Sequence, residues 1–175
     1  MGRQSEKENL VNLVINDPEK FNEIKDDETN LSESDFSNLT LTDVDFQDVN
    51  LEGVDFREAI LTNVNFQNCD LTSSNFSHAT IVECDFSSAI LNGTDFSYST
   101  IEYSNFQDAD FAGAVLLESD FSNSDLSSSE NLSASRFDES TIWPDNENLP
   151  HDFDSSISRD LASMQDDEDV QESIY

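Results

Sequence analysis

Residues 31–60 read LSESD FSNLT LTDVD FQDVN LEGVD FREAI when they are divided into groups of five. A large apolar residue begins every group, and this spacing continues without a miss from Leu31 to Leu126. A period of five fits neither the 3.6-residue period of a helix nor the two-residue period of a strand. It is an internal repeat, and so short a repeat predicts a solenoid whose core is continuous from one coil to the next.

Each group follows one pattern around its large central residue. The residue two positions before it is small or slim, and the residue directly before it is often Asp or Asn, as in Val44-Asp45-Phe46. Cys69 and Cys84 both occupy the small position. We therefore interpret them as packing residues rather than as a disulfide or a metal site.

A second period, of 20 residues, is superimposed on the first. Thr40, Ile60, Thr80 and Thr100 recur at this spacing, and β-branched residues favour extended segments. We therefore expect four groups per turn, with phenylalanine and aliphatic residues in separate columns that keep the interior volume constant. The alternation slips by one group at Phe111, where we expect repacking rather than a break. The expected core phenylalanines are Phe36, Phe46, Phe56, Phe66, Phe76, Phe86, Phe96, Phe106, Phe111 and Phe121.

The first 28 residues lack the repeat and predict a short helical cap over the open end of the solenoid. Ser5 with Glu8 resembles a capping box, and Asp17-Pro18 resembles an N-cap followed by the first residue of a second helix. A partner-binding amphipathic helix is the alternative for this segment. The apolar residues that we expect to form the cover are Leu10, Leu13, Val14, Phe21 and Ile24.

The end of the repeat is marked by a change of spacing. Leu132, Phe137 and Ile142 continue at intervals of five but one residue late, which predicts a small bulge between residues 127 and 130. We expect Trp143-Pro144 to end the repeat, because proline cannot donate to a further ladder.

The last segment has a different composition. Phe153, Ile157 and Leu161 are four residues apart and predict a short helix, which would cap this end or pair with a second copy of the chain as a homodimer. Residues 165–172 are an acidic run with the composition of a disordered tail. The chain thus divides into a cap (residues 1–28), a repeat domain (29–144) and an acidic C-terminal segment (145–175).

The repeat resembles that of a known family. Groups such as Val44-Asp45-Phe46-Gln47-Asp48 are similar to the motif of pentapeptide-repeat proteins, and the likeness covers about two thirds of the chain. It implies an all-β solenoid, a right-handed quadrilateral β-helix in which the central and small residues point inward. The N-terminal segment also resembles helical caps of this family.

For function the resemblance is less specific. Some members, the quinolone-resistance pentapeptide proteins, bind DNA gyrase by imitating duplex DNA, which implies a type II topoisomerase as a candidate partner. Those members often carry loops that interrupt the coils, whereas this chain shows no such insertion.

The charge restricts the partners. The chain has 39 acidic and 7 basic residues, a net charge of -32. Such a field opposes nucleic acid and anionic membranes and favours a protein with a basic surface, such as a DNA-binding enzyme. The sequence shows no secretory signal and no apolar run long enough to span a bilayer, so we expect a cytoplasmic protein.

The repeat itself carries much of this charge. Residues 29–143 contain 21 acidic residues and two arginines, a net charge of -19. At 20 residues per coil and ~4.8 Å between coils the rod is roughly 28 Å long, or about one charge per 1.5 Å, against about 1.7 Å for duplex DNA. Nine aspartates precede central residues, where they alternate with Asn and are expected to serve turns. The candidate acidic binding surface is instead Glu33, Asp43, Asp48, Glu52, Glu58, Glu83, Glu102, Asp108 and Glu118.

The sequence is compatible with three explanations of its charge. The first is a binding or scaffold protein that mimics DNA toward a basic partner. The second is a partner-specific adaptor without mimicry, using an exposed apolar patch, and the third is charge that serves solubility alone. An enzyme is not expected, because His78 and His151 are the only histidines and no catalytic constellation, cofactor motif or metal site is recognisable. The apolar patch would be Ile60, Ile90, Tyr98, Tyr103 and Val115.

Overall fold

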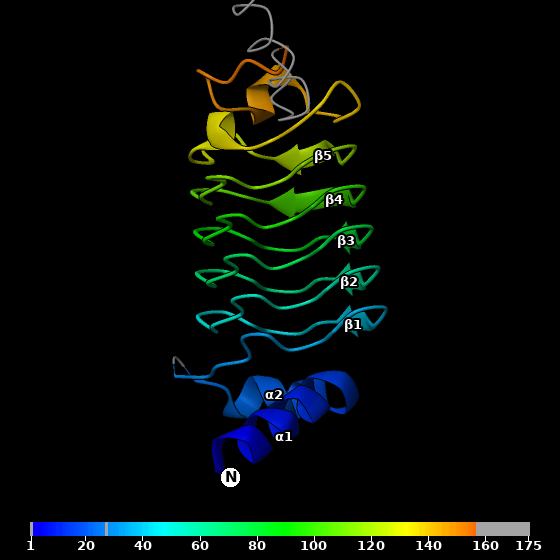
Figure 1. The fold of residues 1–175 in the computed structure, drawn as a ribbon, viewed down its shortest axis with the longest axis vertical. Helices are drawn as coiled ribbons and strands as arrows, with labels where there is room; N and C mark the ends of the chain where they lie inside the picture. The colour runs from blue at the N-terminus through cyan, green and yellow to red at the C-terminus, as the bar shows by residue number, and fades with distance from the viewer. Residues whose placement is uncertain (1, 27, 157–175) are drawn as a thin grey trace, which may run out of the picture.

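The structure is a computed structural model that describes residues 2–26 and 28–156 of the 175-residue chain. Two helices, α1 (Gly2–Asn16) and α2 (Pro18–Ile24), precede a rod of stacked coils. The coils advance in chain order away from the helices, so that sequence position maps onto height along the rod (Figure 1).

Each full coil contributes one regular strand to a parallel sheet, in the order β1-β2-β3-β4-β5. The register advances by one coil of 20 residues: Thr40 lies opposite Ile60, and Ile60 opposite Thr80. The rest of each coil pairs through isolated bridges with the same offset, such as Asp45 with Asn65. The predicted 20-residue coil is therefore confirmed. The strands are β1 (Thr40–Thr42), β2 (Ile60–Thr62), β3 (Thr80–Val82), β4 (Thr100–Asn105) and β5 (Asp120–Asp125).

Four sides enclose the core, and each is defined here by its column of central residues. Side 1 holds Leu31, Leu51, Leu71, Leu91 and Phe111; side 2 holds Phe36, Phe56, Phe76, Phe96 and Leu116; side 3 holds Leu41, Leu61, Ile81, Ile101 and Phe121; side 4 holds Phe46, Phe66, Phe86, Phe106 and Leu126. All of these side chains are at most 2% exposed.

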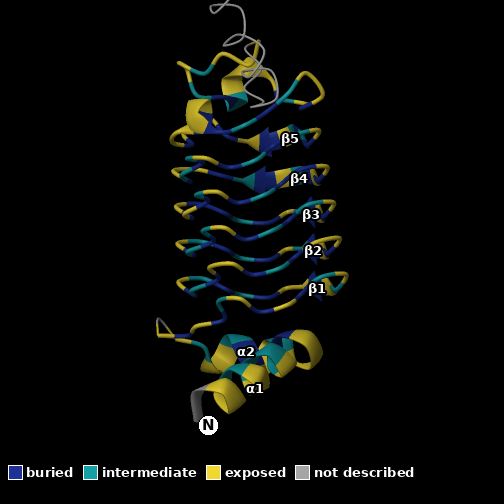
Figure 2. Ribbon diagram, viewed as in Figure 1, coloured by how far each residue is buried: buried dark blue, intermediate teal, exposed yellow. Residues whose placement is uncertain are grey.

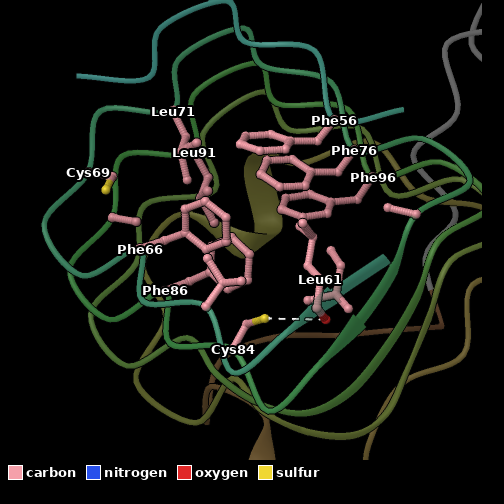
Figure 3. Close-up of a cluster of buried hydrophobic side chains, with 14 of the residues drawn as sticks. Phe56, Leu61, Phe66, Cys69, Leu71, Phe76, Cys84, Phe86, Leu91 and Phe96 are labelled. Atoms are coloured by element: carbon pink, nitrogen blue, oxygen red, sulfur yellow. Dashed lines mark hydrogen bonds between the residues drawn. The ribbon is translucent and has the colours of Figure 1, made fainter. Parts of the chain in front are cut away.

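The phenylalanines of sides 2 and 4 form two parallel stacks across the core. Within each stack consecutive ring centroids lie 4.7–5.4 Å apart. Between the stacks the rings meet edge to face at 5.6–6.3 Å, the geometry that the aromatic quadrupole favours. Figure 3 shows Phe56, Phe76 and Phe96 as one column, with Phe66 and Phe86 beside it.

The slip at Phe111 is absorbed by repacking, as expected. Phe111 and Phe121 move onto sides 1 and 3, and both remain 0% exposed. Phe121 meets Phe96 and Phe106 edge to face at 6.2 and 5.7 Å, so the aromatic cluster continues without a break.

The two N-terminal helices cover the first coil. Asp17 caps α2 by accepting a hydrogen bond from the Lys20 backbone N–H, with Pro18 at the first helical position, as predicted. Phe21 is 0% exposed and meets Phe46 edge to face at 5.6 Å. Val14 is also buried, and Leu10 and Leu13 pack against the same core.

Two N-terminal expectations are wrong. Ser5 and Glu8 form no capping box, because α1 already begins at Gly2 and both residues lie inside it. Ile24 does not join the cover, because α2 ends there with its other face against the coil, and Ile24 is 43% exposed.

The register changes later than the sequence suggested. Asp110 still pairs with Glu130, but Val115 pairs with Arg136, so the extra residue lies between residues 130 and 136 rather than between 127 and 130. A 3-10 turn, η1 (Leu132–Ala134), holds it, and Asn131 before the turn has a positive φ of 55°.

A second extra residue places Trp143, not Ile142, in the column of side 3. Asp120 pairs with Ile142, which is therefore outward and 51% exposed. Trp143 stacks over Phe121 at 6.1 Å, and Leu132 and Phe137 are buried as predicted. The ladder continues past Pro144, since the Leu126 N–H donates to Asn148 O at 2.9 Å, in the turn η2 (Asn146–Asn148).

Phe153 packs on the end of the rod. Its ring lies 4.8 Å from Trp143 and 5.4 Å from Phe137. Residues 151–152 and 155–156 form turns and the two residues between them are irregular, so the expected helix does not begin at Phe153. Ile157, Leu161 and the acidic run 165–172 lie outside the described residues.

Candidate protein-binding surface

The bends of the coils carry most of the candidate acids. From position 33 to position 118, the residue two places after every central residue has a positive φ, 18 positions in succession. These corners are the exposed bends of each coil in Figure 2. Seven candidate acids stand at corners: Glu33, Asp43, Asp48, Glu58, Glu83, Asp108 and Glu118. Glu52 and Glu102 stand one residue earlier, and Glu102 alone of the nine is half-buried.

The structure distributes these acids around the rod instead of gathering them on one face. The corner between sides 2 and 3 holds Glu58 and Glu118, and the corner between sides 3 and 4 holds Asp43 and Glu83. The remaining corners hold Glu33 and, on the far side of side 4, Asp48 and Asp108. A negative field therefore surrounds the rod on every side.

The aspartates that precede central residues have a structural use. Each accepts a hydrogen bond on its carboxylate from the backbone N–H two residues later, at 2.8–3.0 Å. Asn30, Asn50, Asn65, Asn75 and Asn105 make the same bond with their amide oxygens, at 2.8–3.0 Å. These turns explain why Asp and Asn interchange there. The nine aspartates are Asp35, Asp45, Asp55, Asp70, Asp85, Asp95, Asp110, Asp120 and Asp125.

Amides separate many of the stacked carboxylates. Asn65 donates to Asp45 at 3.0 Å, and Asn105 donates to Asp85 at 3.2 Å, along one column of side 4. At the corners Asn63 donates to Asp43, and Asn68 to Asp48, at 2.6 and 2.9 Å. Where an asparagine lies between two acidic residues of a column, its amide donates a hydrogen bond to a carboxylate, so two carboxylates do not repel each other directly.

In the described part of the chain, two isolated bridges pair one acidic residue with another, and each pair has a side-chain donor beside it. Asp35 pairs with Asp55, whose carboxylate accepts two-pronged hydrogen bonds from Arg57 at 2.6–2.9 Å. This guanidinium holds the pKa of Asp55 below its ordinary value. Asp110 pairs with Glu130, and there Asn131 donates to Asp110 at 2.7 Å.

The expected apolar patch does not form as one surface. Ile60 and Tyr98 lie by the corner between sides 2 and 3, and Tyr103 at the next corner. Ile90 lies on side 1, and Val115, on side 2, is only half-exposed. The five residues share no column because their spacings are not multiples of 20.

Sequence reasoning missed one exposed feature, the stacked pair His78 and Tyr98. Their rings are parallel to within 4° and 4.8 Å apart at corners of consecutive coils. The negative charge of Glu118, one coil further on, raises the pKa of Tyr98. The 20-residue spacing of the pair was the available signal.

The two cysteines and the acidic side chains of the described residues are of the types that ligate metal ions. Cys69 and Cys84 are free and buried, and burial raises the pKa of both thiols to about 12. Among the described residues, no three His, Cys, Asp or Glu side chains are arranged to hold a metal ion. Two grooves of about 600 and 650 Å³ flank α1 under the first coil, one lined by Lys7 and Glu33 and the other by Lys7 and Asn30. No helix in the described part of the chain is long and apolar enough to cross a membrane.

The coil pattern and the stacked core define a repeat protein of the β-helix class. A sequence model of the pentapeptide repeat region matches residues 20–96 and 59–142, and the chain therefore belongs to the pentapeptide-repeat family. A comparison with curated proteins returns no match.

Solved structures of pentapeptide-repeat proteins are similar to the chain. One, from the thylakoid lumen of Arabidopsis thaliana, is 28% identical with a TM-score of 0.44, covering 51% of this chain and 66% of its own. HetL of the cyanobacterium Nostoc, involved in heterocyst differentiation regulation, is 19% identical with a TM-score of 0.44, covering 62% and 56%. QnrB1, a plasmid-mediated fluoroquinolone resistance protein, is 13% identical with a TM-score of 0.47, covering 62% and 70%. The chain thus spans less than two thirds of the first two proteins.

Proposed function

We propose that the protein is a non-enzymatic binding protein of the cytoplasm that presents a rigid acidic rod to a protein with a basic surface. In the sharpest form of the proposal the rod mimics duplex DNA toward a DNA-binding enzyme, and the family resemblance makes a type II topoisomerase the candidate. The rod's net charge of about one per 1.5 Å, close to that of duplex DNA, supports mimicry.

The observation that carries the proposal is the use of glutamate at the corners. Glu33, Glu58, Glu83 and Glu118 all have φ between 54° and 59°. Gly, Asn and Asp tolerate this conformation better than glutamate does. The turns of the coil therefore do not require these glutamates, in contrast to the aspartates that accept turn hydrogen bonds. Surface charge is the property that the glutamates add.

The first experiment is a pull-down from nuclease-treated lysate of the source organism, eluted with rising salt and read by mass spectrometry. We expect a DNA-binding protein that elutes between low and moderate salt, because ionic contacts are screened. Inhibition of DNA supercoiling by the purified protein would then test the topoisomerase. A bound protein that handles no DNA and survives high salt would favour the adaptor function instead.

The chain offers a matched pair of variants with equal loss of charge. One changes the nine candidate acids to the corresponding amides, and the other changes the nine turn aspartates to asparagine. Both should fold, since an amide oxygen still accepts the turn hydrogen bond. We expect the first variant to lose partner binding much more than the second. Equal losses of binding would show that only the total charge matters. If neither variant lost binding, the acidic surface would be excluded as the binding site.

A further inference from the structure

Side 3 is unlike the other sides of the rod. All five regular strands begin on it, and β1 to β3 lie wholly on it, whereas β4 and β5 continue round the next corner to Asn105 and Asp125. The other sides pair mainly through isolated bridges. Its outward residues in the first three coils include no acid. We name this surface the threonine face. It consists of Thr40, Thr42, Ile60, Thr62, Thr80, Val82 and Thr100, the last at the start of β4.

The turn chemistry of the coil explains the contrast. On the other sides an Asp or Asn before most central residues folds the chain into a turn, so those sides carry charge or amides. In the first four coils of side 3 that position is Thr40, Ile60, Thr80 or Thr100, which favour an extended chain and offer no carboxylate, and only the fifth coil has an aspartate there, Asp120. The result is a flat sheet face of β-branched side chains, with Ile60 48% exposed at its centre.

Acidic and aromatic residues border this neutral face on both sides. Glu58, His78 and Tyr98 stand on one corner, and Asp43, Glu83 and Tyr103 on the other. Tyr98 and Tyr103 are 49% and 66% exposed. An uncharged centre with exposed tyrosines and a charged rim is the anatomy of a protein-protein interface.

We propose that the threonine face is the part of the rod that contacts the protein partner, and that the partner presents an apolar strip between two rows of lysine or arginine. The inference rests on the proposed function and adds the face to it. The acidic rims select this occupant by charge. A second copy of the chain would place rim carboxylates against rim carboxylates, and a nucleic acid or anionic lipid would be repelled in the same way.

The face is tested by site-specific photo-crosslinking in lysate, with benzoylphenylalanine placed at position 80 or, on the opposite side 1, at position 72. We expect position 80 to give one discrete cross-linked protein and position 72 to give none. The captured protein is identified by mass spectrometry and purified for titration. The identity of the captured protein and the salt dependence of its binding test the proposed function. The position from which it is captured tests the threonine face, so failure of the proposed function can be distinguished from failure of this inference.

Titration of the purified partner then uses the matched variants Thr80→Arg and Thr72→Arg, which change the net charge equally. We expect Thr80→Arg to weaken binding at least tenfold, because a bulky cation occupies the centre of the face, and Thr72→Arg to bind like the parent. Thermal unfolding of both variants checks that they are folded. A partner that cross-links from position 72, or that binds Thr80→Arg like the parent, overturns the inference.

A second pair of variants examines the rim without altering the sheet. The double change Glu58→Gln and Glu83→Gln lies on the two rims, and Glu33→Gln with Glu52→Gln removes the same charge beside side 1. We expect the rim pair to weaken binding about tenfold and to reduce its salt dependence, with a smaller effect from the control pair. Equal effects of the two pairs would also overturn the inference.

Discussion

A single acceptor atom decides the shape of most turns in this rod. Asp95 illustrates this, since its carboxylate accepts the Ser97 backbone N–H at 2.8 Å. Ser97 is buried, so this N–H has little access to water as a replacement. The acceptor, not the negative charge, is what the turn needs, and the coil repeats this arrangement with aspartate or asparagine.

Asp95 therefore provides a test of charge against hydrogen bonding. We expect Asp95→Asn to leave the free energy of unfolding unchanged or slightly higher, because the acceptor stays and one repelling charge is removed. Asp95→Ala should cost about 1–3 kcal/mol, the usual penalty for a buried donor without a partner. Urea unfolding of the two variants measures the difference. Equal destabilisation by both changes would mean that the carboxylate charge itself stabilises the coil.

Arg57 neutralises the place where two turn aspartates stack. Its guanidinium lowers the pKa of Asp55 below the ordinary value of 3.8, so this pair stabilises the fold above that pH and ceases to do so as the pH falls through the folded-state pKa. We expect Arg57→Met to lower the urea midpoint at pH 7 and to differ less from the parent at pH 3. A difference that stays constant from pH 7 to pH 3 would contradict the assignment.

At the scale of elements, the N-terminal cap imitates a missing coil with side chains. In each upper coil, the groups equivalent to Ser32 O, Asp45 N and Gln47 O pair with the coil below. In the first coil Lys7 donates to Ser32 O, Lys25 donates to Gln47 O at 2.8 Å, and the Asn22 amide oxygen accepts Asp45 N–H at 2.9 Å. The cap thus closes an open strand edge.

Asn22 is the most informative member of this cap, because its amide nitrogen also donates to Asp43 O at 3.0 Å. We expect Asn22→Ala to cost about 1–2 kcal/mol more than Asn16→Ala, since two backbone groups of the first coil lose their partner. Asn16 is a fair control, because it lies on a helix and its amide bonds only within α1. Thermal unfolding of the two variants under the same conditions measures the difference. If their unfolding midpoints decreased by the same amount, the proposed role of Asn22 in closing the first coil would be wrong.

The same scale shows where sequence reasoning succeeds and where it stops. The columns of Phe56 and Phe66 were predictable, because a strict repeat determines both whether a side chain points inward and which coil of the rod it belongs to. The last coil was not, since Trp143 enters the column of Phe121 only after two extra residues have been absorbed. The spacing of five by itself predicted that Ile142 points inward. Nothing in the sequence shows in which turn of the last coil each extra residue is accommodated.

At the scale of the whole molecule, the sequence predicted the charge of the surface but not its arrangement. The candidate acids could be separated from the turn aspartates by their positions within the five-residue groups. The structure places them at all four corners of the coil or one residue before a corner. The neutral threonine face emerged only with the structure. The column of β-branched residues that includes Thr40 and Thr80 was visible in the sequence. Its position between two acidic corners became clear only when the structure showed the order of the sides around the coil.

Salt acts on this rod in two opposite directions, which gives a prediction for the molecule as a whole. Coils about 4.8 Å apart place like charges within a Debye length, so self-repulsion opposes the folded state at low salt. We expect the thermal midpoint to rise by several degrees between 20 and 500 mM NaCl, while affinity for the basic partner falls over the same range. The variant with nine candidate acids changed to amides should show a smaller rise. A midpoint that falls with salt would mean that attractive ion pairs outweigh the net charge of -32.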